Sequence, residues 1–281
     1  MRETKGKLIA VFNPGKHGSG STTFALGLGI ALEYITHKKV LIVNNADNLS
    51  LMEKFIENNI NVEYSIDNLQ IFNSSISGKT IETYATMIND NLFMLAGTSM
   101  DNEIRKTDMQ FEENFINECR KIYDIVVMDL PARISDKNAN AFYLDKADLI
   151  IAAVKYNEID LDDIFVKPIY LSSSEILMNE KTYVTLNFMD KDSDIPKEVE
   201  RLKKKYGFKS AYGFAYDGNI INVCCKQRKM YSYIQDELYK ENHVFPQQLK
   251  EFSEEVIRKL ELECEFVEKP KPGLLKSLFR K

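Results

Sequence analysis

Short, continuous apolar runs recur along the chain and are separated by segments with helical spacing of apolar residues. Alternating patterns are typical of sheets with one wet face, whereas unbroken runs of four to seven apolar residues indicate strands covered on both sides. The segments 22–35 and 111–123 have helical spacing. The runs predicted as strands are residues 7–12, 40–43, 92–95, 125–128, 149–154 and 183–186. We therefore predict a doubly wound α/β domain over residues 1–268, with a mostly parallel sheet and helices on both faces.

The last thirteen residues, KPKPGLLKSLFRK at 269–281, differ in pattern from the rest. Two prolines and a glycine end the preceding helix and form a spacer. At about 100° per residue, the apolar residues of the following segment share one side and the basic residues take the other. This pattern predicts an interfacial helix on an anionic membrane, and docking on the domain itself or on a partner protein is the alternative. The candidate membrane residues are Leu274, Leu275, Lys276, Leu278, Phe279 and Arg280.

Composition narrows the class of protein. The chain has 281 residues, 44% of them hydrophobic, which excludes a disordered or low-complexity chain. Its net charge of −5 argues against polyanion binding by the chain as a whole, so DNA is a less favoured partner. The basic clusters at 201–209 and 226–229 are more simply explained as solvated surface. No run of about 18 apolar residues occurs, and the cysteines lack metal-ligand spacing. We expect a cytoplasmic protein that is peripheral to the inner face of the cell membrane.

A glycine-rich segment, GKHGSGSTT at residues 15–23, lies between the first predicted strand and helix. Such a turn directs several backbone N–H groups to one point, where the helix dipole also favours negative charge. The ordinary phosphate loop reads GxxxxGK[ST], with its lysine on the β- and γ-phosphates. Here Gly15 and Gly20 hold the glycine positions and Thr22 the hydroxyl position, whereas Ser21 replaces the lysine.

This segment resembles the deviant Walker A motif, KGGxGKTT, of the ParA/MinD ATPases. In that alignment Lys16 is the signature lysine, His17 replaces a glycine, and Ser21 replaces the second lysine. The resemblance implies ATP and Mg²⁺ as cofactors and a face-to-face homodimer in which Lys16 reaches the partner's phosphates. The implied nucleotide-contacting residues in the loop are Gly15, Lys16, His17, Gly18, Ser19, Gly20, Ser21, Thr22 and Thr23.

Further motifs extend the resemblance over residues 7 to about 260. YDIVVMDLPARIS at 123–135 resembles the family's Walker B and switch II segment, which makes Asp129 the implied Mg²⁺ and catalytic carboxylate alongside Thr22 and Lys16. A helix-capping role for Asp129 is the alternative. Asn187 ends a strand where the family reads the adenine edge, although asparagine is also a common turn residue. The segment that begins at Gly213 resembles the family's GviPyD loop beside the base and supplies Asp217.

A second departure lies at switch I. The family's strand ends in DxDxx, but VLIVNNADN places Asn44 and Ala46 at the acidic positions, and Asp47 lies one residue beyond. Losses of a phosphate-clamping lysine and of a metal-positioning carboxylate reduce phosphoryl transfer by orders of magnitude. The backbone N–H groups of the loop remain, so we expect ATP binding with weak or absent hydrolysis.

Three functional hypotheses follow. The favoured one is an atypical ParA/MinD-like scaffold on the membrane that dimerises and, through an unidentified protein partner, positions a larger assembly such as a pilus or secretion machine. The analogy there is to the TadZ/CpaE-like proteins and rests on function rather than on a matched signature. The first rival is an active ATPase in division-site placement or DNA partition. The second is a ligand-free pseudo-ATPase scaffold.

Overall fold

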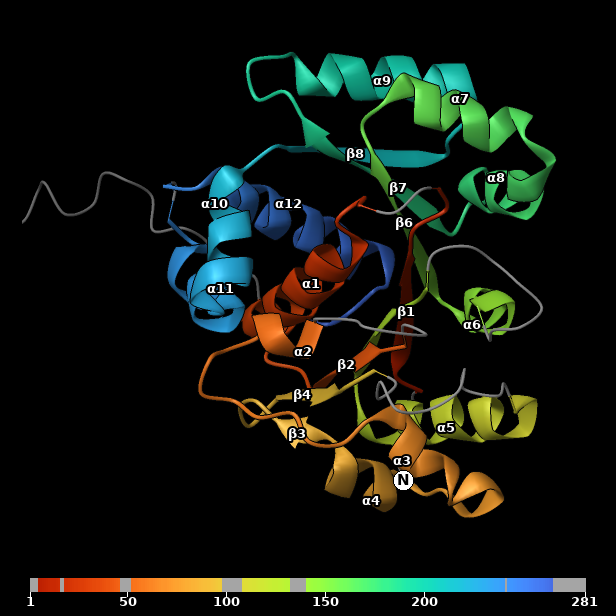
Figure 1. Cartoon of the computed structure of the whole chain (residues 1–281), viewed down its shortest axis with the longest axis vertical. Coiled ribbons are helices and arrows are strands. Elements are labelled where there is room, and N and C mark those ends of the chain that lie inside the picture. Colours follow the sequence, from red (N-terminus) through yellow and green to blue (C-terminus); the bar gives the residue numbers. More distant parts are fainter. Residues whose placement is uncertain are drawn as a thin grey trace, which may run out of the picture.

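A computed structural model describes residues 5–15, 18–45, 52–97, 108–131, 140–240 and 242–264. Within these ranges the chain forms one sheet of eight strands in the order β3-β4-β2-β5-β1-β6-β7-β8. Helices cover both faces of this sheet (Figure 1). All neighbouring strands are parallel except the β3–β4 pair. The predicted doubly wound α/β fold is thus confirmed.

Each continuous apolar run predicted as a strand is a strand. The central ones are buried along almost their whole length, because helices pack on either side of them. The bounds are β1 (Lys7–Phe12), β2 (Val40–Asn44), β4 (Leu92–Leu95), β5 (Ile125–Asp129), β6 (Leu149–Lys155) and β7 (Thr182–Met189).

Two strands escape the pattern, and both lie at the edges of the sheet. The short β3 (Thr86–Met87) is antiparallel to β4, and β8 (Ser210–Ala215) is parallel to β7. The first half of β8 is only half-buried, so its sequence, SAYGFA, lacks the unbroken apolar run of a central strand. Edge position therefore explains why neither strand was predicted.

The helix layers divide the core in two. One face of the sheet carries α1 (Ser21–Thr36), α2 (Met52–Phe55), α10 (Gly218–Ile221), the π-helical turn η3 (Asn222–Gln227), α11 (Met230–Glu237) and α12 (Val244–Lys259). The other carries α3 (Ile66–Gln70), η1 (Asn73–Ser75), α4 (Gly78–Tyr84), α5 (Met109–Ile122), α6 (Asn140–Lys146), α7 (Glu158–Val166), η2 (Pro168–Tyr170), α8 (Leu171–Leu177) and α9 (Ile195–Tyr206). Helix α1 is buried on nearly all sides. The loop that precedes it therefore ends on a firmly packed helix.

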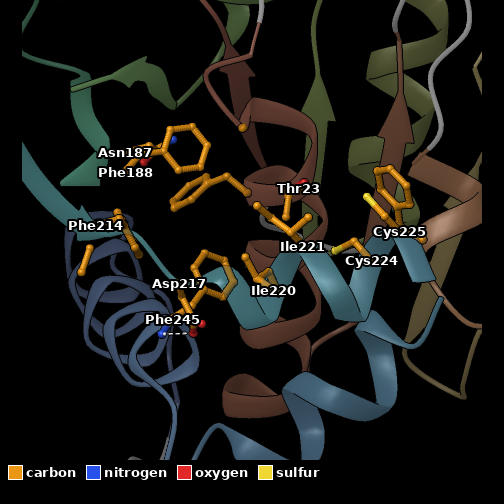
Figure 2. A pocket seen from close by; sticks show the side chains of 14 residues that line it. Thr23, Asn187, Phe188, Phe214, Asp217, Ile220, Ile221, Cys224, Cys225 and Phe245 are labelled. Atoms are coloured by element: carbon orange, nitrogen blue, oxygen red, sulfur yellow. Dashed lines mark hydrogen bonds between the residues drawn. The ribbon is translucent and has the colours of Figure 1, made fainter. Parts of the chain in front are cut away.

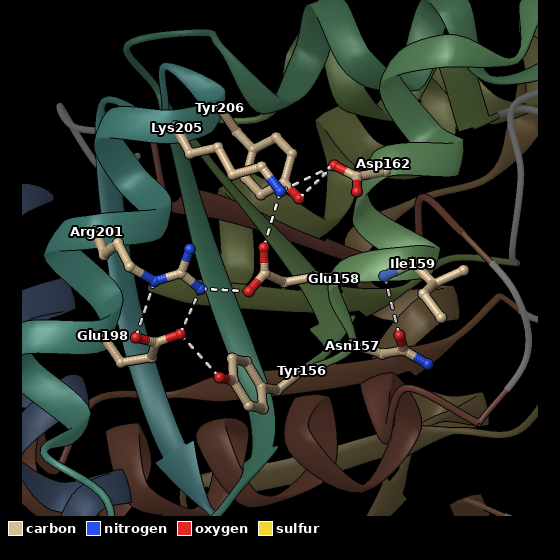
Figure 3. Close-up of polar contacts among 9 residues, drawn as sticks. All are labelled: Tyr156, Asn157, Glu158, Ile159, Asp162, Glu198, Arg201, Lys205 and Tyr206. Atoms are coloured by element: carbon tan, nitrogen blue, oxygen red, sulfur yellow. Dashed lines mark hydrogen bonds and ion pairs between the residues drawn. The ribbon is translucent and has the colours of Figure 1, made fainter.

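An exposed ion network joins α7 to α9 on the second face (Figure 3). Arg201 pairs with Glu158 and donates from Nε to Glu198 Oε2 at 3.0 Å. Lys205 Nζ lies 2.8 Å from Glu158 Oε2, and the Tyr156 hydroxyl donates to Glu198 Oε1 at 2.8 Å. The Arg201 guanidinium lowers the pKa of Glu198 to about 2. Because every member has a partner, this network acts as a clamp between the two helices.

No helix in the described part of the chain is long and apolar enough to cross a membrane. The predicted spacer and amphipathic segment at 269–281 lie outside the described residues. The same holds for the boundary placed at residue 268, so the predicted domain division stays a prediction.

Candidate nucleotide-binding site

The glycine-rich loop connects β1 to α1 at the carboxyl edge of the sheet. Two of its residues, Gly18 (φ 87°) and Gly20 (φ 80°), adopt the left-handed conformation that glycine tolerates best. Gly20 is the residue before the first turn of α1, and its carbonyl accepts the Phe24 N–H at 2.9 Å. The chain therefore turns from strand to helix as a phosphate-binding loop requires. Lys16 and His17 lie outside the described residues, so the trans role of Lys16 stays a prediction.

Ser21, at the position of the missing lysine, is the first residue of α1. A serine hydroxyl at this point cannot reach as far as a lysine ammonium and carries no charge. Residues 18–23 thus present backbone N–H groups and hydroxyls to a ligand, with no cationic side chain among them. Positive charge beyond the partial charge of the helix N-terminus would therefore have to come from other residues or from a metal ion.

Thr22 and Asp129 meet as the sequence predicts. The Thr22 hydroxyl donates to Asp129 Oδ2 at 2.7 Å and so joins the start of α1 to the end of β5. Asp129 is 1% exposed, and its Oδ1 has no partner among the described residues. Burial raises the pKa of this carboxyl to about 7, against a smaller lowering by the Thr22 hydrogen bond. A buried carboxylate with a free oxygen is an unsatisfied group that a cation would satisfy.

This pair fits Mg²⁺. Magnesium prefers oxygen ligands, and it commonly takes only one or two from the protein and the others from phosphates and water. No cluster of three or more His, Cys, Asp or Glu side chains suited to a metal occurs in the described ranges. The Thr22 hydroxyl and the Asp129 carboxylate therefore match a nucleotide-linked magnesium rather than a metal held by the protein alone.

The end of β2 lies beside Asp129. Asn44 is fully buried and is the register partner of Asp129, and the Asn45 N–H donates to the Asp129 carbonyl at 2.9 Å. The Asn44 amide donates to Glu53 Oε2 at 3.0 Å. Glu53 could not be predicted as a site residue, because it lies on α2 outside any motif. Ala46 and Asp47 lie outside the described residues.

A mainly apolar cavity of about 150 Å³ borders the loop at Gly20 (Figure 2). Its walls come from the start of α1, the ends of β7 and β8, and the segment from α10 through η3. The labelled side chains that close it include Phe214, Ile221, Cys225 and Phe245. Apolar walls with few polar groups are typical of pockets that bind small molecules.

Asn187 connects this cavity to the phosphate loop. It lines the cavity from the end of β7, and its Nδ2 donates to the Ser19 carbonyl at 2.8 Å. This bond fixes the orientation of the amide, and the buried Oδ1 has no partner among the described residues. An oriented acceptor suits an exocyclic amino group such as that of adenine. The structure thus brings Asn187 to the predicted place, and base recognition stays a prediction.

Phe188 packs on the loop although it belongs to none of the motifs in the sequence. It has φ 66°, which is rare for a bulky residue, and it sits where the β7–β8 register shifts between Leu186 and Met189. A Cβ on Gly20 would lie 3.0 Å from the tip of the Phe188 ring. The ring therefore packs directly on the loop, and only glycine fits at position 20 without displacement.

Asp217 lines the cavity, but hydrogen bonds to the backbone engage both of its oxygens. Oδ1 accepts the Asn219 N–H at 2.9 Å and so caps α10, while Oδ2 accepts the Phe245 N–H at 3.3 Å at the start of α12 (Figure 2). The carboxylate positions the cavity wall, and its predicted contact with a nucleotide stays a prediction.

The chain matches no protein-family model and no curated protein. It is similar to solved structures of ParA and MinD proteins. A ParA family ATPase from Chlorobium tepidum is 13% identical, with a TM-score of 0.70 over 88% of this chain and 98% of that one. MinD in the MinC:MinD cell division complex of Aquifex aeolicus is 16% identical, with a TM-score of 0.65 over 90% and 96%. A plasmid partition protein from Borrelia burgdorferi bound to AMPPNP is 16% identical, with a TM-score of 0.64 over 91% and 100%. At these identities the comparisons show the ParA/MinD fold.

Proposed function

We propose that this chain is an atypical ParA/MinD-family protein that binds Mg·ATP with weak or no hydrolysis. The observation that carries the proposal is the buried Thr22–Asp129 contact beside a glycine-rich loop in which Ser21 replaces the lysine. Among the similar structures, the Borrelia protein is bound to AMPPNP and a Pyrococcus horikoshii MinD is complexed with Mg-ADP. The same two ligands suit the loop, the carboxylate and the apolar cavity described above.

The arrangement favours binding over catalysis. Backbone N–H groups of residues 18–20 and the N-terminus of α1 attract phosphates, and Asn187 orients a base. Thr22 and Asp129 would hold Mg²⁺, which neutralises phosphate charge when bound. Phosphoryl transfer needs more positive charge close to the β- and γ-phosphates than Ser21 supplies. We therefore expect slow or undetectable turnover.

We further propose that the protein works as a homodimer on an anionic membrane surface, where it positions a larger assembly. Lys16 would supply phosphate-neutralising charge to the partner subunit, and residues 273–281 would hold the dimer on the inner face of the cell membrane. One short amphipathic segment binds weakly, and two on a dimer bind far better because the second is already close to the surface. The MinC:MinD complex is a precedent for a protein partner on this fold.

The nucleotide proposal is tested by titrating Mg·ATP into the full chain by calorimetry, up to about 1 mM. We expect micromolar binding by the wild type, loss of most of the affinity in Thr22→Val, and retention in Thr22→Ser, which keeps the hydroxyl. No detectable binding by the wild type, checked with a fluorescent nucleotide, would refute the proposal and favour the ligand-free scaffold.

The membrane proposal is tested by liposome flotation. Removal of residues 273–281 should abolish binding to vesicles containing anionic lipid and leave nucleotide affinity unchanged. Neutral phosphatidylcholine vesicles are the control for charge. Undiminished flotation of the shortened chain would show that any membrane contact is made elsewhere.

An active ATPase is the second candidate. It is favoured by the retained Thr22–Asp129 pair and by the ATPase neighbour from Chlorobium tepidum. In that case Lys16 replaces the missing lysine, and turnover rises with lipid, DNA or a partner. Hydrolysis that exceeds the background in the wild type and disappears in Lys16→Ala would favour this candidate.

A further inference from the structure

We propose that Glu53 supplies the metal-positioning carboxylate that the end of β2 lacks. The inference rests on the proposed Mg·ATP site and assigns it one more residue, on an element outside every motif of the sequence. Glu53 would act as a positioning residue that holds a water bound to the metal, with Thr22 and Asp129 as the direct ligands.

Asn44 and Asp129 lie on the same face of the sheet. Alternate residues of a strand face the same way. Ile42 of β2 and Val127 of β5 belong to the core on the α1 side of the sheet, so Asn44 and Asp129, two residues further along, face that side as well. Their strands are neighbours, about 4.8 Å apart. The Thr22 hydroxyl reaches Asp129 from α1 on this same side.

The Asn44 amide holds Glu53 in place. Helix α2 packs on the α1 side of the sheet, and the Asn44 amide donates to Glu53 Oε2 at 3.0 Å. A Cβ on Gly97 would lie 2.8 Å from Asn44 Nδ2, so the chain after β4 packs against this amide and limits its movement. The fully buried Asn44 thus presents the half-buried Glu53 carboxylate at the end of β2.

The Asp129 carboxylate needs a cation beside it. Asp129 Oδ1 is buried and has no partner among the described residues, which is an independent sign of a ligand. Mg²⁺ keeps several of its waters, and these waters need acceptors around them. Asp129 on β5 supplies one carboxylate. Glu53 supplies a second, which is joined to the end of the neighbouring strand β2 through Asn44. The acidic side chain that β2 lacks at position 44 is therefore replaced by a carboxylate from α2.

The test measures how Mg²⁺ changes nucleotide affinity. AMPPNP is titrated into the full chain by calorimetry in EDTA and at a series of MgCl₂ concentrations, for the wild type and Glu53→Gln. The substitution keeps an acceptor for Asn44 and removes only the charge. We expect the Mg²⁺ concentration that gives half of the affinity gain to rise about 10-fold or more, as is usual when an outer-shell partner is lost. Affinity in EDTA should stay the same.

Two further variants separate this role from a general charge effect. Glu63→Gln removes the same charge from an exposed residue in the same connection and should behave as the wild type. The double variant Asn44→Asp with Glu53→Gln moves the carboxylate onto the strand and leaves an amide to pair with it. It should recover most of the Mg²⁺ dependence lost in Glu53→Gln alone.

The outcomes distinguish this inference from the proposed function. If the wild type binds AMPPNP and Glu53→Gln shows the same Mg²⁺ dependence, the role of Glu53 is overturned. The Mg·ATP site itself then stays in place. Wild-type binding that is the same in EDTA and in MgCl₂ would remove the metal from both proposals. Absence of AMPPNP binding by the wild type would overturn the proposed function and this inference together.

Discussion

Two polar clusters of the molecule differ in what they leave unsatisfied. At the carboxyl edge of the sheet, Asp129, Ser19 and Asn187 are almost fully buried, and each has a side-chain oxygen without a partner among the described residues. Between α7 and α9, Arg201 and Glu198 are exposed or half-buried and have charged partners (Figure 3). Their effects on acidity are opposite, since burial raises the pKa of Asp129 and the Arg201 hydrogen bonds lower that of Glu198.

The difference distinguishes the proposed nucleotide site from the ion network between α7 and α9. Burial of a polar atom without a partner costs about 1–3 kcal/mol, so a fold keeps several such atoms together only where something else satisfies them. Exposed ion pairs contribute little to stability, and the charges of the clamp are already paired with one another. Unsatisfied buried atoms are thus a better guide to the ligand than the number of charges in a cluster.

The largest effect is expected when the same glycine-to-alanine substitution is made once in each region and nucleotide affinity is compared. Gly20 and Gly207, at the end of α9, both have left-handed backbone conformations, with φ 80° and 77°. An alanine in that conformation costs about 1–2 kcal/mol, so Gly207→Ala should destabilise the fold by that amount, and Gly20→Ala by more because its Cβ would also crowd the Phe188 ring. Only Gly20→Ala meets the Phe188 ring, and we expect it to weaken ATP binding by roughly 10- to 100-fold, measured by calorimetry. Equal losses of affinity in the two variants would contradict the assignment of the loop.

Asp129→Asn should give the next effect, on stability without metal. The folded protein carries this carboxyl with its pKa raised from 3.8 to about 7, so the wild type loses stability as pH rises from about 4 to 7 and stays lower above 7. A shift of about three pH units corresponds to roughly 4 kcal/mol, of which an unpaired buried amide takes back about 1–3 kcal/mol.

In denaturant unfolding with EDTA at pH 8, Asp129→Asn should therefore be more stable than the wild type by roughly 1–3 kcal/mol. By about pH 4 this advantage should be lost, and the variant should then be less stable than the wild type by roughly 1–3 kcal/mol, the cost of the unpaired amide. An advantage that is the same at both pH values would show that ionisation of this carboxyl is not its cause. The variant should also lose the Mg²⁺ dependence of nucleotide binding.

Ser21→Lys should have a smaller effect, confined to the phosphates. A lysine at this position reaches the β- and γ-phosphates in the ordinary loop, so ATP affinity should rise about 10-fold, while AMP affinity should not change. Ser21→Met is the control for side-chain length without charge. Equal gains for ATP and AMP would argue against this placement of the phosphates. If the wild type proves to be an active ATPase, turnover should change only modestly.

The smallest effect belongs to the clamp. Its contribution exists above the ordinary glutamate pKa of 4.5 and is lost as pH falls toward 2, where Glu198 becomes protonated. Because the network is exposed, Glu198→Gln should lower the free energy of unfolding at pH 7 by less than about 1 kcal/mol, with no difference near pH 2. Glu200→Gln, which removes an exposed i,i+3 pair with Lys203, is the control. Neither variant should alter nucleotide affinity.

Most of the fold was predictable because the central strands bury both faces. Runs such as VLIV at 40–43 and IVVM at 125–128 are typical of buried strands and are shorter than a buried helix would be. The position of Thr22 relative to Asp129 was predictable too, since each belongs to a local motif that places it at the carboxyl edge.

The remainder depends on contacts between distant parts of the chain. Glu53 reaches the site through Asn44, and no spacing rule connects a residue on a four-residue helix to a strand end. The left-handed conformation of Phe188 coincides with the register shift between β7 and β8, which the sequence of either strand does not reveal. Local patterns therefore located the loop and the carboxylate, whereas the acceptor from α2 and the ring on the loop required the assembled fold.

The single amide of Asn187 has a consequence for how the two halves of the site communicate. Its nitrogen holds the Ser19 carbonyl of the loop, and its oxygen remains for a ligand in the cavity. A base that pulls on the oxygen therefore polarises the bond to the loop, and a loop that shifts turns the oxygen away from the base. Aspartate has nearly the same shape but no donor, so a change of one atom would uncouple the halves. In the proposed nucleotide site, base binding and loop position would therefore be coupled through this one amide at the end of β7.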